Sequence, residues 1–469
     1  MPYPTGLVVR RPSTLRLVLP FAAAALAGCG GGRASGPDLL LVTVDTLRAD
    51  RLGCYGGAPG AAAAICGLRE RGVLYRWAFS AAPSTAPAIA SLLTSRYPSS
   101  HGVSELFSTA LARDERTLAE ELAAAGFDTA AFVSNPVLAP ARALDQGFRV
   151  YDAEMTRRER NRPGLAEREA ARTTDAAIAW LAGAREPWFL WVHYQDPHGP
   201  YEPPGAAPAR DAPGSRALPL LRDHSGRGGI PAYQELPGVR SPEAYEARYR
   251  AELDYLDREL ARLLRAGGSA GRPLGVLLTA DHGEAFGEDD YWFAHGHSLG
   301  LDQIRVPLLW QPPGGVAAAT VAAPVSTLDV APTLLLAAGL PLPESFQGLP
   351  LASAEPAAAS AARPLFAEHR LRAAVVAGGR YYARDRRDFA QPVPDRITGG
   401  QLQPLPARVA RLEPEGRLPG YEAPAGAEGQ ALERALADFL DPARAAAAAA
   451  ARALPAEARQ GLEALGYLE

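Results

Sequence analysis

Four apolar runs that each end abruptly in polar residues constrain the fold more than any other feature of this chain. They are DLLLVTV before Asp45, DTAAFVS before Asn135, PWFLWVHY before Gln195 and LGVLLTA before Asp281. Near-continuous apolar runs of this length are typical of parallel strands that are covered on both faces. With helical stretches between them, they predict an α/β fold in which helices sandwich a central, mostly parallel sheet and chemistry sits at the strand ends.

The remaining segments complete this division of the chain. We expect a catalytic domain over residues 38–350, with a helix that begins after the N-cap residue Ser241. Residues 203–239, rich in Gly, Pro, Arg and Ala, are too long for an ordinary connection and predict either a lid near the site or a disordered insertion. Residues 351–469 predict a smaller sheet subdomain and a helical tail, with an Ala-rich helix over 442–453.

The N-terminus has the pattern of a targeting segment. A basic stretch is followed by LRLVLPFAAAALAGC, whose apolar part is shorter than the roughly 20 residues that cross a bilayer. Its end resembles the lipobox of bacterial lipoproteins, which implies that residues 1–28 are removed and that lipidated Cys29 anchors the chain in a membrane. Residues 29–37 then form a tether. The alternatives are a plain cleaved signal peptide or an uncleaved anchor. We expect an exported lipoprotein of the cell envelope, in the periplasm or on the outer surface.

Composition removes several classes of protein. The chain has 48 basic and 52 acidic residues and no basic stripe, which argues against nucleic-acid binding. Its three cysteines are too few for a disulfide scaffold or a zinc finger. Cys54 and Cys66 could pair in an oxidising periplasm or remain buried thiols. All basic side chains except those of histidine are arginine, because the sequence contains no lysine.

Titratable residues cluster after the strand-like runs. Asp45 could bind a metal or cap the following turn. Asp281 and His282 end a buried strand, and His295 and His297 follow closely, so the sequence predicts a metal or catalytic site there.

Two further stretches carry candidates of the same kind. In WVHYQDPHGPY, His193 sits within the strand and is interpreted as a satisfied core histidine, whereas His198 on the loop beyond it is the better functional candidate. In PSTAPAIASLLTS, Ser84 or Thr85 could cap a helix, or Thr85 could be a nucleophile.

These motifs, taken in order, resemble those of the sulfatase family within the alkaline phosphatase superfamily. The resemblance rests on VTVDTLRADRLGCYG, STAPAIASLLTSRYPSSHGV, HYQDPHGPY and TADHGEAFGE with HGHSLGLDQIRVPLLW, and it covers almost everything after residue 37. It implies a central mixed sheet between helices, a smaller C-terminal sheet, and metal-assisted attack on a sulfate or phosphate ester.

The resemblance also shows where this chain departs from the family. Thr85 stands where a Cys or Ser is converted to formylglycine, and Pro87 matches the motif's proline. Ala88 and Ile89 replace the motif's Ser and Arg, and the usual active-site lysine is missing. Because threonine does not give formylglycine, we expect none here and expect Thr85 itself to attack.

The implied metal site is altered in a related way. Asp45 matches the first metal carboxylate, but the family's second Asp is Thr46. Asp281 and His282 match the later pair, with His282 where calcium-binding members often carry an amide. Together with Thr85, this set of ligands resembles that of single-metal phosphoryl transferases, which form a phosphothreonine. Carboxylate and imidazole ligands favour Mn²⁺ or Zn²⁺ over Ca²⁺, and a bound metal would lower the pKa of the threonine hydroxyl.

The predicted function is hydrolysis of a sulfate or phosphate mono- or diester, with phosphate esters or phosphonates preferred. The resemblance places His198 at the transferred group and His295 near the position of the missing lysine. These two histidines would stabilise negative charge or protonate the leaving group. His297 is a further substrate-binding candidate. The substrate would be a small molecule or a glycan or lipid ester. Two alternatives remain: a transferase moving a phosphoryl-alcohol group onto an envelope lipid or glycan, and a catalytically silent envelope-binding protein.

Overall fold

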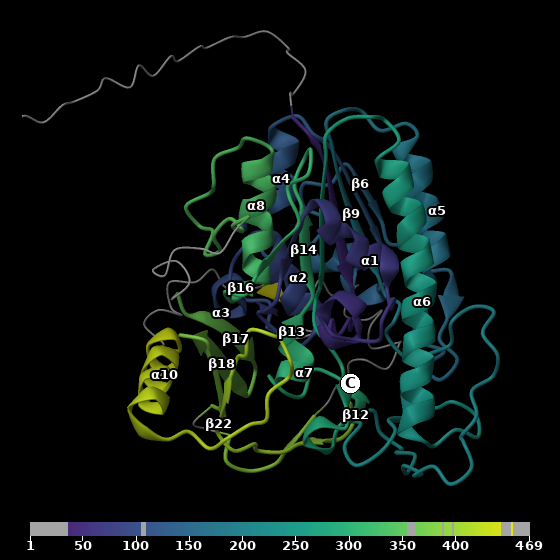
Figure 1. Ribbon diagram of the computed structural model, residues 1–469, viewed down its shortest axis with the longest axis vertical. Coiled ribbons are helices and arrows are strands. Elements are labelled where there is room, and N and C mark those ends of the chain that lie inside the picture. The colour runs from purple at the N-terminus through teal and green to yellow at the C-terminus, as the bar shows by residue number, and fades with distance from the viewer. Residues whose placement is uncertain are drawn as a thin grey trace, which may run out of the picture. The chain divides into compact units, whose positions relative to one another are not determined.

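An eight-stranded sheet lies at the centre of the computed structural model, which describes residues 36–104, 109–353, 363–386, 389–395, 398–441 and 452–453 (Figure 1). From edge to edge its strands are β15 (Ala319–Val321), β2 (Val73–Tyr75), β14 (Leu308–Gln311), β10 (Leu274–Ala280), β1 (Asp38–Val44), β9 (Trp188–Tyr194), β5 (Asp128–Val133) and β6 (Val150–Asp152). All neighbouring pairs are parallel except the two that involve β14. The mostly parallel sheet is therefore confirmed, and the four predicted strands are β1, β5, β9 and β10.

Helices cover both faces of this sheet, as the unbroken apolar runs require. Helices α1 (Ala63–Gly67), α5 (Ala170–Leu181) and α6 (Pro242–Gly267) pack together on one face, and α2 (Thr85–Thr94), α4 (Leu118–Ala124) and α8 (Val330–Ala337) pack on the other (Figure 1). All seven residues of β1 are buried. The start of α6 is confirmed, because the Ser241 hydroxyl accepts a hydrogen bond from the Ala244 amide as an N-cap does.

A smaller antiparallel sheet follows the central one in sequence. Its strands, in order, are β17 (Leu365–His369), β18 (Arg372–Ala377), β19 (Arg380–Asp385) and β22 (Arg408–Arg411), and α10 (Gly426–Phe439) packs against β18 and β19. This confirms the predicted C-terminal sheet. Residues 442–451, most of the predicted Ala-rich helix, lie outside the described residues.

Short elements connect these layers. The remaining helices are α3 (Pro98–His101) and α7 (Leu301–Ile304), and the 3₁₀ turns are η1 (Ala49–Arg51), η2 (Gly53–Tyr55), η3 (Leu68–Arg71), η4 (Pro136–Leu138), η5 (Pro140–Arg142), η6 (Ala232–Gln234), η7 (Glu288–Asp290) and η8 (Thr327–Asp329). The minor strands are β13 (Arg305–Val306), β3 (Ala78–Phe79) and β16 (Val325–Ser326) in one sheet, and the pairs β7 (Arg157–Arg158) with β8 (Ala166–Glu167), β11 (Ala285–Phe286) with β12 (Trp292–Ala294), β20 (Val393–Pro394) with β21 (Gln401–Leu402), and β4 (Thr109–Ala110) with β23 (Arg452–Ala453).

The two cysteines that follow β1 are paired in the structure. Cys54 and Cys66 form a disulfide that joins η2 to α1, with their Cα atoms 5.6 Å apart. A cross-link that closes a loop of this length stabilises the fold by about 3 kcal/mol, chiefly by restricting the unfolded chain.

The N-terminal predictions stay predictions, because the leader, Cys29 and most of the tether lie outside the described residues. The described residues belong to one compact unit. Within the part of the chain that is described, no helix has both the length and the apolar character needed to cross a bilayer.

Candidate active site

The register of the central strands brings two predicted ligand positions to one edge of the sheet. Val44 of β1 lies opposite Tyr194 of β9 and Ala280 of β10, so the residues that follow these strands emerge side by side. Asp45 and Asp281 are those residues on β1 and β10, and both are almost wholly buried.

The side chains at this edge form a compact cluster of possible metal ligands. One ligand atom each of Asp45, His193 and Asp281 lies within 4.8 Å of the other two. The Nε2 atom of His282 lies 3.5 Å from Asp45 Oδ1 and 3.5 Å from Asp281 Oδ2. Asp45 Oδ1, His193 Nε2 and Asp281 Oδ2 are buried atoms with no hydrogen-bond partner among the described residues. Buried polar atoms are rarely left without a partner, so their convergence fits a bound cation.

The electrostatics of the two aspartates also fit a cation. Burial and the neighbouring Asp45 carboxylate raise the pKa of Asp281 far above its ordinary value. Burial by itself would raise the pKa of Asp45 too, but the imidazoles of His193, His198 and His282 bring it below its ordinary value. Two adjacent buried carboxylates cannot both ionise cheaply unless a positive charge lies between them. Asp45, His193 and Asp281, with His282 beside them, can therefore hold a divalent metal ion.

His193 is the ligand candidate that the sequence missed. Its Nδ1 atom is 2.8 Å from Thr43 Oγ1, which also accepts a hydrogen bond from Trp191 Nε1. Its Nε2 atom points instead to Asp45 Oδ2 at 3.9 Å. One ring nitrogen is thus satisfied in the core, as expected, but the other faces the metal cluster. A histidine at the last-but-one position of a strand next to Asp45 was the available signal.

Thr85 is the first residue of α2 and contacts this cluster. Its Oγ1 atom is 3.2 Å from His282 Nε2, and its side chain is nearly buried. Ser84 is the N-cap of α2 but its side chain makes no capping hydrogen bond. The structure therefore shows no capping hydrogen bond from the Ser84 side chain. Thr85 faces the predicted metal ligands.

Two polar residues complete the surroundings of Asp45. Asn135, which follows β5, donates a hydrogen bond from Nδ2 to Asp45 Oδ2 at 2.6 Å. Thr46 has a positive φ of 54°, a conformation that is strained for a β-branched residue, and its buried Oγ1 has no partner within the described chain. Strain of this kind persists where surrounding structure enforces it, as at a ligand-binding turn.

The histidines from the two remaining motifs gather around the same point. The ring of His295 lies 4.5 Å from that of His282 and 5.1 Å from that of His198, measured between centroids. Glu284, which is fully buried, accepts a hydrogen bond from His295 Nδ1 at 3.0 Å. Burial would lower the pKa of His295, but the Glu284 carboxylate raises it above the ordinary value. Burial lowers the pKa of His198 to about 3, so His295 binds a proton more readily than His198 does.

His297 is the one predicted site residue that the structure does not bring to this group. It is buried, with its ring stacked 3.6 Å from that of Tyr291 and its Nε2 atom 2.9 Å from Gln303. It does not line the cavity that opens over Thr85, whereas His295 does.

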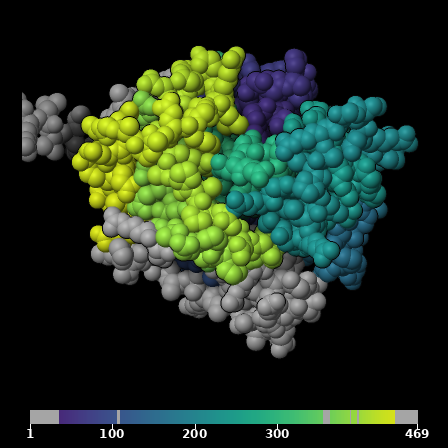
Figure 2. Space-filling model, turned by 90° about the horizontal axis from the view of Figure 1, so that it is seen from below, coloured from purple at the N-terminus to yellow at the C-terminus, as the bar shows by residue number. Residues whose placement is uncertain are grey.

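A cavity of about 760 Å³ opens over Thr85, His198 and His295. Part of its wall comes from the 203–239 insertion, whose residues His224 and Tyr233 line the cavity. The backbone amide of His224, in the insertion, donates to the carbonyl of Thr398 at 2.7 Å. Seen from below, the teal segment that contains the insertion lies beside the yellow-green C-terminal segments (Figure 2).

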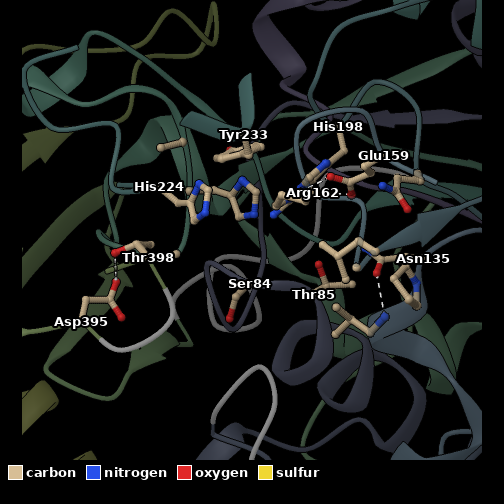
Figure 3. Close-up of a pocket in the computed structure, with 18 of the residues that line it drawn as sticks. Ser84, Thr85, Asn135, Glu159, Arg162, His198, His224, Tyr233, Asp395 and Thr398 are labelled. Atoms are coloured by element: carbon tan, nitrogen blue, oxygen red, sulfur yellow. Dashed lines mark hydrogen bonds and ion pairs between the residues drawn. The ribbon is translucent and has the colours of Figure 1, made fainter. Parts of the chain in front are cut away.

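Another part of the cavity wall was not foreseen. The turn between β7 and β8 contributes residues from Glu159 to Leu165, and Arg162 reaches in between Tyr233, His198 and Glu159 (Figure 3). The sequence ERNRPG indicates a charged turn but carries no sign that this turn approaches the strand ends. Only the packing of the hairpin on the insertion brings it there.

The chain is similar in sequence to known sulfatases. The sequence model of the family described as Sulfatase matches residues 37–340. The chain is 26% identical over 353 residues to the uncharacterized sulfatase YidJ of Escherichia coli (strain K12), a match that covers 66% of this chain and 70% of the relative. It is also 26% identical over 344 residues to an ulvan-active sulfatase of Formosa agariphila, covering 66% of this chain and 63% of that relative.

A solved structure extends the similarity to the fold as a whole. The phosphonate monoester hydrolase of Agrobacterium radiobacter has a TM-score of 0.62 and 22% sequence identity, and the match covers 88% of this chain and 96% of the other. At this identity the likeness establishes the fold alone.

Proposed function

Because the chain belongs to the sulfatase family and is thus an ester hydrolase, we propose that it cleaves a sulfate or phosphate ester by attack of the Thr85 hydroxyl. One observation carries this assignment: Thr85 Oγ1 lies 3.2 Å from His282 Nε2, at the boundary between the metal cluster and the cavity. A nucleophile must meet both the activating group and the space that receives the ester, and Thr85 does so.

The donor set supports a specific class of metal for this reaction. Asp45, His193 and Asp281 would hold the ion, with His282 and Thr85 at its edge. Because imidazole nitrogens contribute, we propose Mn²⁺ or Zn²⁺ in preference to Ca²⁺, which takes oxygen ligands. When bound, such an ion lowers the pKa of a nearby hydroxyl and offsets negative charge on the transferred group.

The protein groups around Thr85 have distinct tasks in this proposal. His282 places Nδ1 2.9 Å from the Gly283 carbonyl, so its Nε2 lone pair faces Thr85. As the Thr85 oxygen bonds to phosphorus or sulfur, its proton passes to His282 Nε2. The bond to the leaving oxygen breaks, and His295 Nε2–H gives that oxygen a proton. Glu284 holds the imidazolium in place. Water then attacks the threonine ester and gives a proton to His295, while His282 returns its proton to the Thr85 oxygen. This releases phosphate or sulfate and restores the hydroxyl.

We infer a preference for phosphate esters or phosphonates over sulfate esters. Without formylglycine, the covalent threonine ester can be hydrolysed only by attack of water. The resemblance to single-metal phosphoryl transferases implies a phosphothreonine as such an intermediate. A phosphonate monoester hydrolase shares the fold. The cavity of about 760 Å³ has room for a leaving group well beyond the transferred group, so a small-molecule or glycan ester fits, in line with the ulvan-active relative.

The assignment of Thr85 is tested by comparing Thr85→Ala with Ser84→Ala. Both proteins are loaded with Mn²⁺ or Zn²⁺ and given an aryl phosphate, an aryl phosphodiester and an aryl sulfate. We expect Thr85→Ala to lower kcat by about 10³-fold or more, because a lost nucleophile leaves only binding and charge stabilisation. Ser84→Ala should retain most activity. Mass spectrometry of acid-quenched wild-type reactions should show phosphothreonine at residue 85.

Two outcomes would contradict the proposal in different ways. Unchanged turnover in Thr85→Ala would remove Thr85 as the nucleophile while leaving the hydrolase. No turnover of any ester by the wild-type protein would favour a binding protein that keeps the cleft for recognition.

We also propose that the protein acts in the bacterial cell envelope, held by a lipid on Cys29. The lipobox-like sequence LAGC supports the anchor, and the Cys54–Cys66 disulfide supports an oxidising compartment such as the periplasm.

A further inference from the structure

The altered nucleophile motif leaves the site without two of the cations that the family resemblance leads one to expect. Ile89 stands in place of the motif's arginine, and the chain has no lysine. Transfer of a sulfuryl or phosphoryl group builds negative charge on non-bridging oxygens, and fixed positive groups that face those oxygens are a major source of rate enhancement. The question is which side chain of this protein takes their place.

Arg162, at the turn of the β7–β8 hairpin, has the geometry for this task. Its Nε and Nη2 atoms donate to Glu159 at 2.6 and 3.0 Å, and Glu159 is almost fully buried. Its guanidinium carbon lies 4.4 Å from the centre of the Tyr233 ring. An ion pair on one edge and an aromatic ring on one face hold the guanidinium plane in a fixed orientation. The side chain keeps 21% of its surface exposed, so it is not sealed off from the cavity.

The position of Arg162 relative to the catalytic histidines identifies which part of the cavity it serves. Arg162 and Thr85 line the same cavity. After burial and the other imidazoles, the charge of Arg162 is among the factors that lower the pKa of His198, and it acts in the same direction on His295 and on His224. The guanidinium is therefore close enough to all three rings for its charge to act on them. In Figure 3, Arg162 and His198 are drawn close to one another above Thr85.

We propose that Arg162 binds a non-bridging oxygen of the transferred phosphoryl or sulfuryl group, and so supplies from an unrelated hairpin the positive charge that the altered nucleophile motif has lost. This rests on the proposed function of Thr85. In this arrangement Glu159 and Tyr233 are positioning residues, which act by fixing the guanidinium. Arginine suits the task because its planar fork of N–H donors matches the geometry of phosphate and sulfate oxygens.

The test measures binding of the transferred group by itself. Inorganic phosphate and inorganic sulfate are titrated calorimetrically into the Mn²⁺-loaded wild-type protein, Arg162→Ala and Arg160→Ala. Arg160 lies on the same hairpin but pairs with Glu202 and the Glu235 carbonyl, and it does not line the cavity. We expect Arg162→Ala to weaken binding of at least one anion by about 10- to 100-fold, the loss of one charge-assisted contact, and Arg160→Ala to leave it unchanged.

Added guanidinium ion separates a direct contact from damage to the hairpin. Because Arg162→Ala leaves a space of matching shape between Glu159 and Tyr233, guanidinium should restore anion binding in this variant, and it should not change binding by the wild-type protein. Turnover should follow the same pattern, with kcat/KM lowered about 10²- to 10³-fold and partly rescued.

Several results would overturn the proposal. Unchanged anion affinity in Arg162→Ala, together with a higher KM for the ester, would place Arg162 on the leaving group instead. Failure of the wild-type protein to bind either anion would also overturn it. If the wild-type protein turns over no ester but Arg162→Ala loses rescuable anion binding, the role of Arg162 stands and the proposed reaction fails.

Discussion

His193 shows how one side chain can serve the core and the site together. Its Nδ1 atom is tied to Thr43, and Thr43 is tied in turn to Trp191, so the imidazole ring is fixed from inside the sheet. Its Nε2 atom is left facing Asp45. Metal-binding histidines commonly have their second nitrogen held in this way, which sets the tautomer and the direction of the ligand atom.

At this scale we predict that His193 is a metal ligand. In His193→Ala, affinity for Mn²⁺ or Zn²⁺ should fall by at least about 10- to 100-fold, since even partners that only orient ligands contribute this much. Thr43→Ala should cause a smaller loss. Affinity is measured by competition with a chelator, which needs no substrate.

The matched control for this measurement is His101→Gln. His101 is equally buried, but it bonds to Ser91 and to the Val103 amide and belongs to no candidate metal cluster of the described chain. Metal affinity that is unchanged in His193→Ala would leave His282, the ligand that the sequence predicted, as the nitrogen donor.

At the scale of elements, α2 is held in place by a contact that does not take part in the chemistry. Ser91 on α2 and His101 on α3 are both buried, and Ser91 Oγ lies 2.8 Å from His101 Nε2. Because His101 Nδ1 accepts the Val103 amide, Nε2 carries the proton and donates it to Ser91. A neutral imidazole therefore fastens the two helices, and the orientation of α2 decides where its first residue, Thr85, points.

This fastening should make stability depend on pH. Burial and the charge of Arg96 lower the pKa of His101 to about 3. The unfolded chain binds a proton at His101 below about pH 6.5, whereas the folded protein does not until about pH 3, so this histidine's contribution to stability is complete above 6.5 and decreases as the pH falls. Between pH 7.5 and 5 the loss should be roughly 2 kcal/mol.

The measurement is urea unfolding of the wild-type protein and His101→Gln at both pH values. In the variant, the free energy of unfolding should decrease by roughly 2 kcal/mol less between pH 7.5 and 5, because His101 no longer contributes and the other buried groups are common to both proteins. Identical pH dependence in the two proteins would show that His101 does not stay neutral in the fold.

For the molecule as a whole, the proposed lipid anchor at Cys29 decides where in the cell the protein is held. We predict that the wild-type protein, expressed in a bacterium, fractionates with membranes and carries lipid on Cys29. Cys29→Ser should lose the lipid and enter the soluble fraction, because burial of acyl chains in the bilayer is what holds the protein there.

Cys54→Ser is the control, since it removes the disulfide and leaves the lipobox intact. It should remain with the membranes. A wild-type protein that is soluble after cell breakage, or that is cut elsewhere and carries no lipid, would contradict the anchor.

The amino-acid sequence alone predicts the class of fold and the acidic residues that follow two of the central strands. Apolar runs that stop at Asp45 and Asp281 predict both the sheet and its active edge, because burial on two faces leaves polar residues only where strands end. Thr85, His198 and His295, which were predicted from motifs that are local in the chain, line one cavity. The predicted helix start at Ser241 holds because capping depends on near neighbours.

Which side chains from distant segments meet depends on how the chain packs in three dimensions. The direction of His193 Nε2 depends on the register of β9 beside β1, and the approach of Arg162 depends on how a hairpin packs on Tyr233. The burial of His297 against Tyr291 and the pairing of Cys54 with Cys66 depend on such packing too. Local patterns report periodicity and chemistry, but a contact between segments is fixed by the packing of the whole chain, and no single stretch of sequence encodes it.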